Sequence, residues 1–265
     1  MALAGKGIAP QASATPGALT FAEQSGNATS PAQVVTVKNT GSAPLHLGAP
    51  TITGSAAGDF SAASSCTAPV APGGTCTVSV TFRPTGIGAR AAQLDLPADD
   101  PAAPVTVVLN GTGKNLVGNS QFETDVKGWN VTTGTSLTQA SPGHGGGLAA
   151  KVTNTTTAKA TCTLNDSPNV VATTATTGTY TGSMWVRSDT AGATLRLRFR
   201  EYDKVTSALL GTAESIVTLG TGWQRVQVAY PPTKPGGSTL DLNAYASASP
   251  GTCFYADEVA IFLSS

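Results

Sequence analysis

The chain has 265 residues, with 15 basic and 15 acidic side chains and a charged content of only 11%. Zero net charge argues against binding to nucleic acid or to an anionic membrane, and no apolar run of about eighteen residues could cross a bilayer. The 30 Gly, 17 Pro and abundant Thr, Ser and Val, without a helical apolar period, predict an all-β protein of two domains.

The four cysteines fall as one pair in each half of the chain. Cys66 and Cys76 are close in sequence, whereas Cys162 and Cys253 are far apart. The two histidines flank neither pair, which favours two disulfides over a zinc site. Disulfides indicate an oxidising compartment, so we expect a secreted protein. With no secretion signal after Met1, we also expect the sequence to be a fragment of a larger protein.

Residues 1–13 are expected to be the last strand of a preceding repeat and a linker. Ala2–Gly7 echo Val108–Gly113, because each is an apolar strand end followed by Gly-x-Gly. Residues 14–113 then form the first domain. Strands are predicted over residues 34–41, 77–84 and 105–109, with alternating apolar side chains facing a core.

Ordered strands and Gly/Pro/Asn turns over about a hundred residues predict an immunoglobulin-like sandwich. The string LTF…VTVKNTGSAPL…APGGTCTVSVTFRPTGIGAR resembles ASH/major-sperm-protein-like domains, which are repeated in bacterial surface and secreted proteins. That resemblance implies a spacer or a protein-contact module. Acids such as Asp59 and Asp99 stand in turn-like contexts and are expected to be structural.

Residues 114–265 form the second domain. Strands are predicted over 180–187, 194–201, 223–230 and 240–245, each with one side apolar and the other side polar or aromatic. Over Cys253–Phe262, strict alternation would place Phe254, Ala256, Glu258, Ala260 and Phe262 on one side of a closing strand. Trp129 and Trp223 follow glycines at strand entries and are expected to pack in the core.

Several spaced motifs carry a second resemblance. NLVGNSQFE…GW, the run LRLRFREYD and the closing CFYADEVAIF resemble the jelly-roll carbohydrate-binding modules that are attached to xylanases and cellulases. The resemblance implies a jelly-roll β-sandwich that binds carbohydrate without catalysis. It also implies one structural Ca²⁺, held by the acids at Glu123 and Asp257, and carboxylates are ligands that Ca²⁺ prefers.

The polar sides of the predicted strands supply the candidate glycan site. Aromatic rings stack on sugar rings, while arginine, amide and carboxylate groups bind hydroxyls. If the strands are neighbours in one sheet, eight side chains share one face: Trp185, Arg187, Arg196, Arg198, Arg200, Asp241, Asn243 and Tyr245. The alternative is a solvent face in which Glu201, Asp203 and Asp241 neutralise the arginines.

The sequence therefore predicts a monomeric, secreted, non-catalytic fragment: a spacer followed by a calcium-stabilised module that binds a polysaccharide or oligosaccharide. The arginines favour an acidic glycan. Two alternatives stay open. One is a structural stalk or adhesion segment of a surface protein, and the other is a polysaccharide lyase or hydrolase, for which Glu201 and Asp241 are the only carboxylate pair on the expected face.

Overall fold

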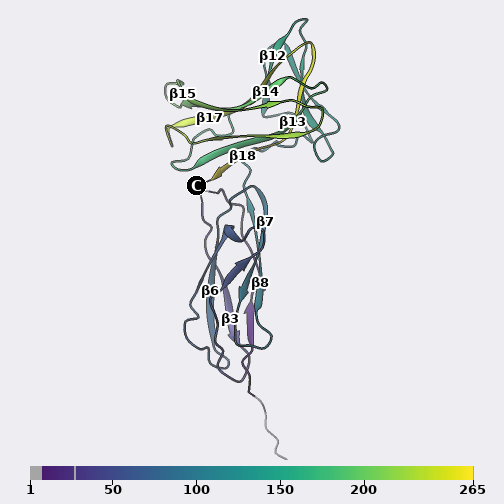
Figure 1. Ribbon diagram of the computed structural model, residues 1–265. Coiled ribbons are helices and arrows are strands. Elements are labelled where there is room, and N and C mark those ends of the chain that lie inside the picture. Colours follow the sequence, from purple (N-terminus) through teal and green to yellow (C-terminus); the bar gives the residue numbers. More distant parts are fainter. Residues whose placement is uncertain (1–7, 27, 265) are drawn as a thin grey trace, which may run out of the picture. The chain divides into compact units, whose positions relative to one another are not determined.

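The structure, a computed structural model, describes residues 8–26 and 28–264. The chain divides into two compact units, Met1–Lys114 and Asn115–Ser265, and each contains two β-sheets (Figure 1). In the described residues the only helical element is one 3₁₀ turn, Ala57–Asp59, so the all-β prediction is confirmed. None of the helices in this part of the chain has the length and apolar character to cross a membrane.

The first unit is a sandwich of two four-stranded sheets. One has the order β1-β3-β6-β5 and the other the order β2-β8-β7-β4. Their bounds are β1 Ala12–Thr15, β2 Ala18–Thr20, β3 Gln33–Asn39, β4 Thr51–Thr53, β5 Phe60–Ser64, β6 Thr75–Phe82, β7 Gly88–Leu96 and β8 Val105–Gly113. Strands β3, β6 and β8 occupy the three segments predicted from apolar alternation.

Alternating apolar residues fill the core of the first unit. Val78, Val80 and Phe82 on β6 are buried, as predicted, and the Phe82 ring lies 4.9 Å from the ring of Phe60. Gly111 on β8 faces Phe82 so closely that a Cβ there would lie 2.5 Å from the ring. The predicted disulfide between Cys66 and Cys76 is present.

The expected remnant of a preceding repeat falls largely on residues 1–7, which lie outside the described residues. Ala12 and Ser13 pair with Asn39 and Lys38 of β3. Strand β1 therefore belongs to the first unit, which begins before the expected boundary at residue 14.

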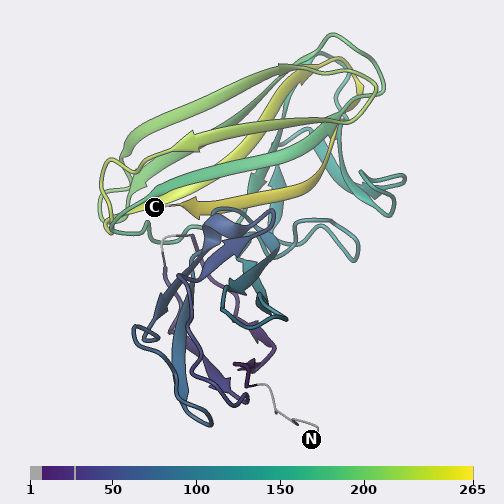
Figure 2. The same ribbon diagram turned by 60° about the horizontal axis from the view of Figure 1, so that its bottom comes forward.

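The second unit is a jelly-roll sandwich of two five-stranded sheets (Figure 2). We call them the β13 sheet, with the order β10-β11-β18-β13-β16, and the β14 sheet, with the order β15-β14-β17-β12-β9. The bounds are β9 Trp129–Val131, β10 Thr135–Ala140, β11 Ala149–Asn154, β12 Ala160–Asp166, β13 Thr179–Arg187, β14 Thr194–Asp203, β15 Leu209–Thr218, β16 Gln224–Tyr230, β17 Ser238–Ala248 and β18 Gly251–Ser264.

The core of the second unit lies between these two sheets. Leu195, Leu197 and Phe199 of β14 are fully buried. The predicted disulfide from Cys162 on β12 to Cys253 on β18 links the two sheets. Trp129 packs in this core, as expected.

Strict alternation fails in the closing strand β18. Glu258 adopts a positive φ of 46°, and the pairing with β13 shifts register nearby, between Ser183 and Trp185. Such a bulge inserts one extra residue and reverses the sides beyond it. The core residues are therefore Phe254 and Ala256, followed by Val259, Ile261 and Leu263, so the expected placing of Ala260 and Phe262 beside Phe254 is wrong.

Candidate functional site

The outer side of the β14 sheet gathers six of the eight predicted binding residues. Because Leu195, Leu197 and Phe199 point into the core, the arginines between them point outward. Across the pairing of β14 with β17, Arg196 lies opposite Tyr245, Arg198 opposite Asn243 and Arg200 opposite Asp241. We call this set of six residues the arginine face.

Two of the three arginines are neutralised within this face. Arg196 Nη1 lies 2.5 Å from Glu214 Oε1, contributed by β15, and both side chains are about one-third exposed. Arg200 pairs with Asp241, whose side chain is only 3% exposed. The same carboxylate accepts a hydrogen bond of 3.0 Å from the Asn243 amide. The charges of Arg196 and Arg200 are therefore compensated.

Arg198, between them, is different. In the described part of the chain it forms no ion pair, and its guanidinium stacks over the ring of Tyr245 at 4.6 Å. The Tyr245 hydroxyl donates a hydrogen bond of 3.1 Å to Glu214, which fixes the ring. Arg198 Nε and Asn243 Oδ1 are buried without a hydrogen-bond partner. An unsatisfied buried polar atom costs roughly 1–3 kcal/mol, so the centre of this face lacks both an acceptor and a donor.

A pair of buried carboxyl groups lies beside Arg200. Burial, together with the charge of Asp241, raises the pKa of Asp166 to about 7, although the backbone N–H groups of Val170 and Leu242 oppose the shift. Asp166 therefore holds a proton below neutral pH, which limits the negative charge buried beside Asp241. Asp241 Oδ1 is itself buried without a hydrogen-bond partner.

Trp185 and Arg187 are not part of the arginine face. They lie on β13, which belongs to the other sheet, so the expectation of one shared face for all eight residues is wrong. The imidazole of His144 stacks on Trp185 with ring centroids 3.8 Å apart and covers one side of the indole. Trp223 lies beside this group, 6.0 Å from His144, and is half-buried, so it does not pack in the core as expected.

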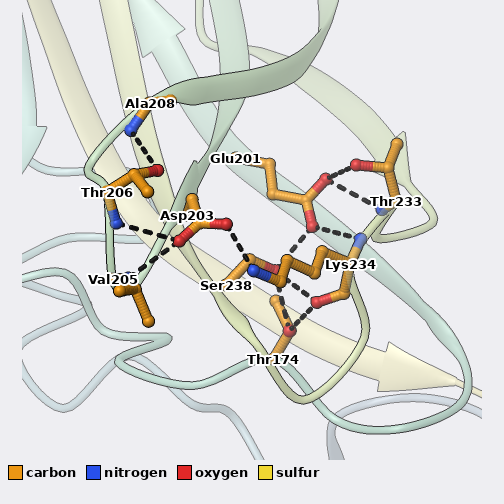
Figure 3. A network of polar contacts seen from close by, with 9 residues as sticks. All are labelled: Thr174, Glu201, Asp203, Val205, Thr206, Ala208, Thr233, Lys234 and Ser238. Atoms are coloured by element: carbon orange, nitrogen blue, oxygen red, sulfur yellow. Dashed lines mark hydrogen bonds and ion pairs between the residues drawn. The ribbon is translucent and has the colours of Figure 1, made fainter.

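The carboxylates proposed for glycosidase chemistry are also separated. Glu201 follows the apolar alternation of β14 and points to the core side, whereas Asp241 points outward. Glu201 is fully buried and accepts hydrogen bonds from Tyr230, Thr233, Lys234 and Ser238. Neither Glu201 nor Asp203, which pairs with Lys234, neutralises the arginines (Figure 3).

Burial alone would raise the pKa of Glu201. The hydroxyls of Ser238 and Thr233 and two backbone N–H groups outweigh burial and lower it to about 2. Figure 3 shows how the loop at residues 233–234 folds over this carboxylate. Glu201 is therefore a structural anion that ties the β16–β17 loop to β14.

The two acids expected to hold calcium lie around one glycine-rich loop. Glu123 accepts hydrogen bonds from the Leu148 backbone N–H, at 3.1 and 3.3 Å, and Asp257 Oδ2 accepts one of 2.8 Å from the His144 backbone N–H. Burial and the charges of Glu258 and Glu123 raise the pKa of Asp257 to about 6, against two backbone N–H groups. Such a concentration of negative charge, with hard oxygen donors, fits a calcium ion.

Within the described ranges, no three His, Cys, Asp or Glu side chains are arranged as a metal-binding group. A calcium ion here would therefore take its other ligands from backbone carbonyls or water. The carbonyls of Gly146 and Leu148 lie close to Asp257 Oδ2, because all three surround the space that a Cβ on Gly143 would occupy.

Sequence reasoning missed Glu214, Ile216 and Asp166. Strand β15 carries the first two, and its alternation over Leu209–Thr218 places Glu214 and Ile216 on the side of the arginines, where Ile216 is 56% exposed opposite Arg196. That alternation was readable from the sequence. The position of Asp166 was not, because it depends on the pairing of β12 with β17.

A comparison with protein families supports the fold of the first unit. The family described as HYDIN/CFA65/VesB-like, Ig-like domain matches residues 24–112, which confirms the immunoglobulin-like domain. A search among curated protein sequences finds no match.

Solved structures similar to this chain include carbohydrate-binding modules. The CBM22-1 xylan-binding domain of Xyn10C from Paenibacillus barcinonensis is 16% identical, with a TM-score of 0.46, over 57% of this chain and 94% of that one. TmCBM61 in complex with β-1,4-galactotriose is 15% identical, with a TM-score of 0.42, over 57% and 99%. A structure reported for promiscuous carbohydrate-binding modules of the β-sandwich superfamily is 12% identical, with a TM-score of 0.45, over 97% and 98%. Similarities at this level say nothing about what this chain binds.

Proposed function

We propose that the second unit binds a polysaccharide or oligosaccharide, without catalysis, on the arginine face. The observation that carries this proposal is Arg198, which forms no ion pair in the described part of the chain and lies over the ring of Tyr245 at the centre of the face. Its side chain is partly exposed, so its guanidinium can donate hydrogen bonds to the hydroxyls or carboxylates of a sugar.

The surroundings of Arg198 suit a sugar ring. Tyr245 and Ile216 offer partly exposed apolar surface on the same side of the sheet. Glu214 and Arg196 at its edge are polar groups that reach hydroxyls. The uncompensated charge of Arg198 favours a uronic acid in the glycan, so an acidic polysaccharide fits this face.

In this proposal, calcium bound at Glu123 and Asp257 stabilises the second unit and takes no part in sugar binding. The first unit acts as a spacer, and the protein is secreted and monomeric. The two disulfides support an oxidising, extracellular location.

Affinity electrophoresis tests this function. The whole chain would be run through gels containing xylan, β-glucan, pectin, alginate or no polymer, beside the variants Arg198→Ala and Lys204→Ala. Lys204 is an exposed cation in the β14–β15 turn, so it controls for lost charge. We expect retardation by at least one polymer, at least tenfold weaker for Arg198→Ala and unchanged for Lys204→Ala, because a hydrogen bond to a charged group contributes about 1.5–3 kcal/mol.

One observation favours a structural stalk instead, since Arg196 and Arg200 are both ion-paired within the face. Migration unaffected by any of the four polymers would support that alternative. Equal loss of retardation in both variants would show that only net charge matters.

A further inference from the structure

The large apolar side chains that the second unit exposes gather on one strand and the turn before it. In the part of this unit that the structure describes they are Val205, Leu209, Leu210 and Ile216, with exposed fractions from 37% to 86%. Val205 lies in the turn that leads into β15, and the other three lie on β15 itself. Single exposed apolar residues are ordinary on a protein surface, but their concentration on one strand indicates a contact surface.

Strand β15 is also an edge of its sheet. It stands at one end of the order of the β14 sheet and pairs along one side only, with β14. Edge strands present N–H and C=O groups that can pair with another chain, and proteins usually blunt them with lysine, proline or a bulge. Between Leu209 and Thr218 the only charged residue is Glu214, there is no proline, and the register shift lies at one end, at Leu210. Most of this edge is therefore open.

The backbone hydrogen bonds around β15 show which of its groups face outward. The Leu219 N–H, just past the strand, donates a hydrogen bond of 2.8 Å to the Ala193 carbonyl, just before β14. Because these groups alternate along an antiparallel strand, odd-numbered residues bond β14 and even-numbered residues point away from it. The Thr218 carbonyl agrees, since it bonds a glutamine side chain of β16. The residues whose backbone groups meet the open edge are therefore Thr212, Glu214 and Ile216.

Two copies of β15 match each other in one antiparallel register. With Ala213 opposite itself on a two-fold axis, Thr212 lies opposite Glu214 of the second copy. The same register sets Leu210 opposite Ile216, so apolar side chains cover each other at both ends. A shift one way places Glu214 opposite itself, and a shift the other way places it opposite Leu210. Like charges directly opposite each other destabilise a strand pair, which favours the register centred on Ala213.

We propose that β15 is a docking edge for a second copy of this chain, which adds its own β15 antiparallel and joins the two β14 sheets into one. Directly opposite residues point to the same side of a sheet, so the two arginine faces lie on one side of the joined sheet. One polysaccharide chain can then bind both faces, which raises the overall affinity without a new contact. This last consequence rests on the proposed function, whereas the pairing itself does not.

The area of this contact makes the pairing weak. The paired residues, 209–217, form a strip about 30 Å long and about 10 Å deep, or roughly 300 Å² on each chain. Stable interfaces bury about 800 Å² on each partner. Dilute chains are therefore monomers, as proposed above. The pairing acts where copies are concentrated, as they are along one polysaccharide.

Cysteine crosslinking of the whole chain tests this register. Both native cysteine pairs form disulfides, so each variant gains one free thiol. Ala213→Cys sets two Cα atoms about 4.5 Å apart, whereas Ser215→Cys sets them about 14 Å apart. A disulfide requires a Cα separation below about 7 Å. Residues 213 and 215 are both half-buried on the same side of β15, so Ser215→Cys is the matched control.

Under mild oxidation of concentrated protein without glycan, Ala213→Cys should form a linked dimer at least about tenfold faster than Ser215→Cys. Adding Thr212→Pro to Ala213→Cys should lower the rate to that of Ser215→Cys, because proline removes an outward N–H and leaves the pairing with β14 intact. Tryptophan fluorescence would confirm that each variant is folded.

Equal rates for Ala213→Cys and Ser215→Cys, or a rate that Thr212→Pro leaves unchanged, would overturn the assignment of this edge. Because the assay contains no glycan, that result would leave the proposed glycan binding untouched. Unaltered migration in the polysaccharide gels would likewise leave the pairing of β15 untouched, so the two proposals fail separately.

Discussion

Glu201 is the buried acid on which the loop of residues 233–238 depends, and its replacement by glutamine should destabilise the second unit. The difference between its ordinary pKa of 4.5 and about 2 in the folded chain corresponds to about 3 kcal/mol. In Glu201→Gln, the NH₂ group of the new amide would face the backbone N–H and hydroxyl groups that now donate hydrogen bonds to the carboxylate (Figure 3). At 2–4 °C per kcal/mol, the midpoint of unfolding should fall by roughly 6–12 °C at pH 7.

The pH dependence follows from the direction of the shift. Because the folded-state pKa of Glu201 is lowered, its contribution is fully present above about pH 4.5 and is lost as the pH falls towards 2. The difference between the parent chain and Glu201→Gln should therefore be largest at neutral pH and should shrink by about 3 kcal/mol at pH 2. Taking the difference between two chains removes the opposite trends of Asp166 and Asp257, whose pKa values are raised.

The assay is tryptophan fluorescence during thermal unfolding at pH 7, 4 and 2.5. Trp129, Trp185 and Trp223 are the three tryptophans of the chain, and all lie in the second unit, so the signal reports on that unit alone. Glu214→Gln is the matched control, since its one-third-exposed ion pair with Arg196 should contribute under about 1 kcal/mol. A Glu201→Gln chain as stable as the parent at pH 7, or a loss that is equal at pH 7 and pH 2.5, would refute the role of this anion.

Three further predictions concern calcium, the two disulfides and Asp166. Adding calcium should raise the unfolding midpoint of the second unit and a chelator should lower it, and Asp257→Asn should remove both responses. Equal responses in that variant would place the ion elsewhere. Breaking Cys162–Cys253 should cost roughly 4.5 kcal/mol, against roughly 2.5 kcal/mol for Cys66–Cys76, because the longer loop gains more freedom in the unfolded chain. Unfolding in urea of the two variants in which one cysteine pair is replaced by serines measures both costs. A larger cost for Cys66–Cys76 would contradict the chain-entropy explanation. Since the folded-state pKa of Asp166 is raised to about 7, its stabilising proton is lost as the pH rises through neutral. Asp166→Asn should therefore cost less at pH 8 than at pH 5, and a pH-independent cost would contradict the raised pKa.

Most of the fold could be predicted from residue alternation. Leu195, Leu197 and Phe199 identify β14 and its core side, and both disulfide pairs follow from one even pair of cysteines in each half. Alternation alone does not assign a strand to one sheet of a sandwich or the other. For that reason Arg187 and Arg198, which look equivalent in the sequence, lie on opposite sheets.

The remaining errors have local causes. A single bulge at Glu258 reversed the sides of the last residues of β18, and a backbone irregularity of that kind leaves no alternation signal in advance. Trp223 follows a glycine, as a core tryptophan such as Trp129 does, but it lies beside Arg187 and His144 outside the core. Trp223 and His144 both lie in loops, and the sequence does not specify the paths of those loops.

The arginine face is tested most directly by the Nε–Hε signal of Arg198 in ¹⁵N NMR spectra of the whole chain. Oligosaccharides cut from whichever polymer retards the protein would be added in steps. Glycan binding at this face predicts a progressive shift of the Arg198 signal, with the signal of Arg187 unchanged, because Arg187 lies on the other sheet. A shift confined to Arg187, or an unmoved Arg198 signal at oligosaccharide concentrations that saturate binding, would contradict it.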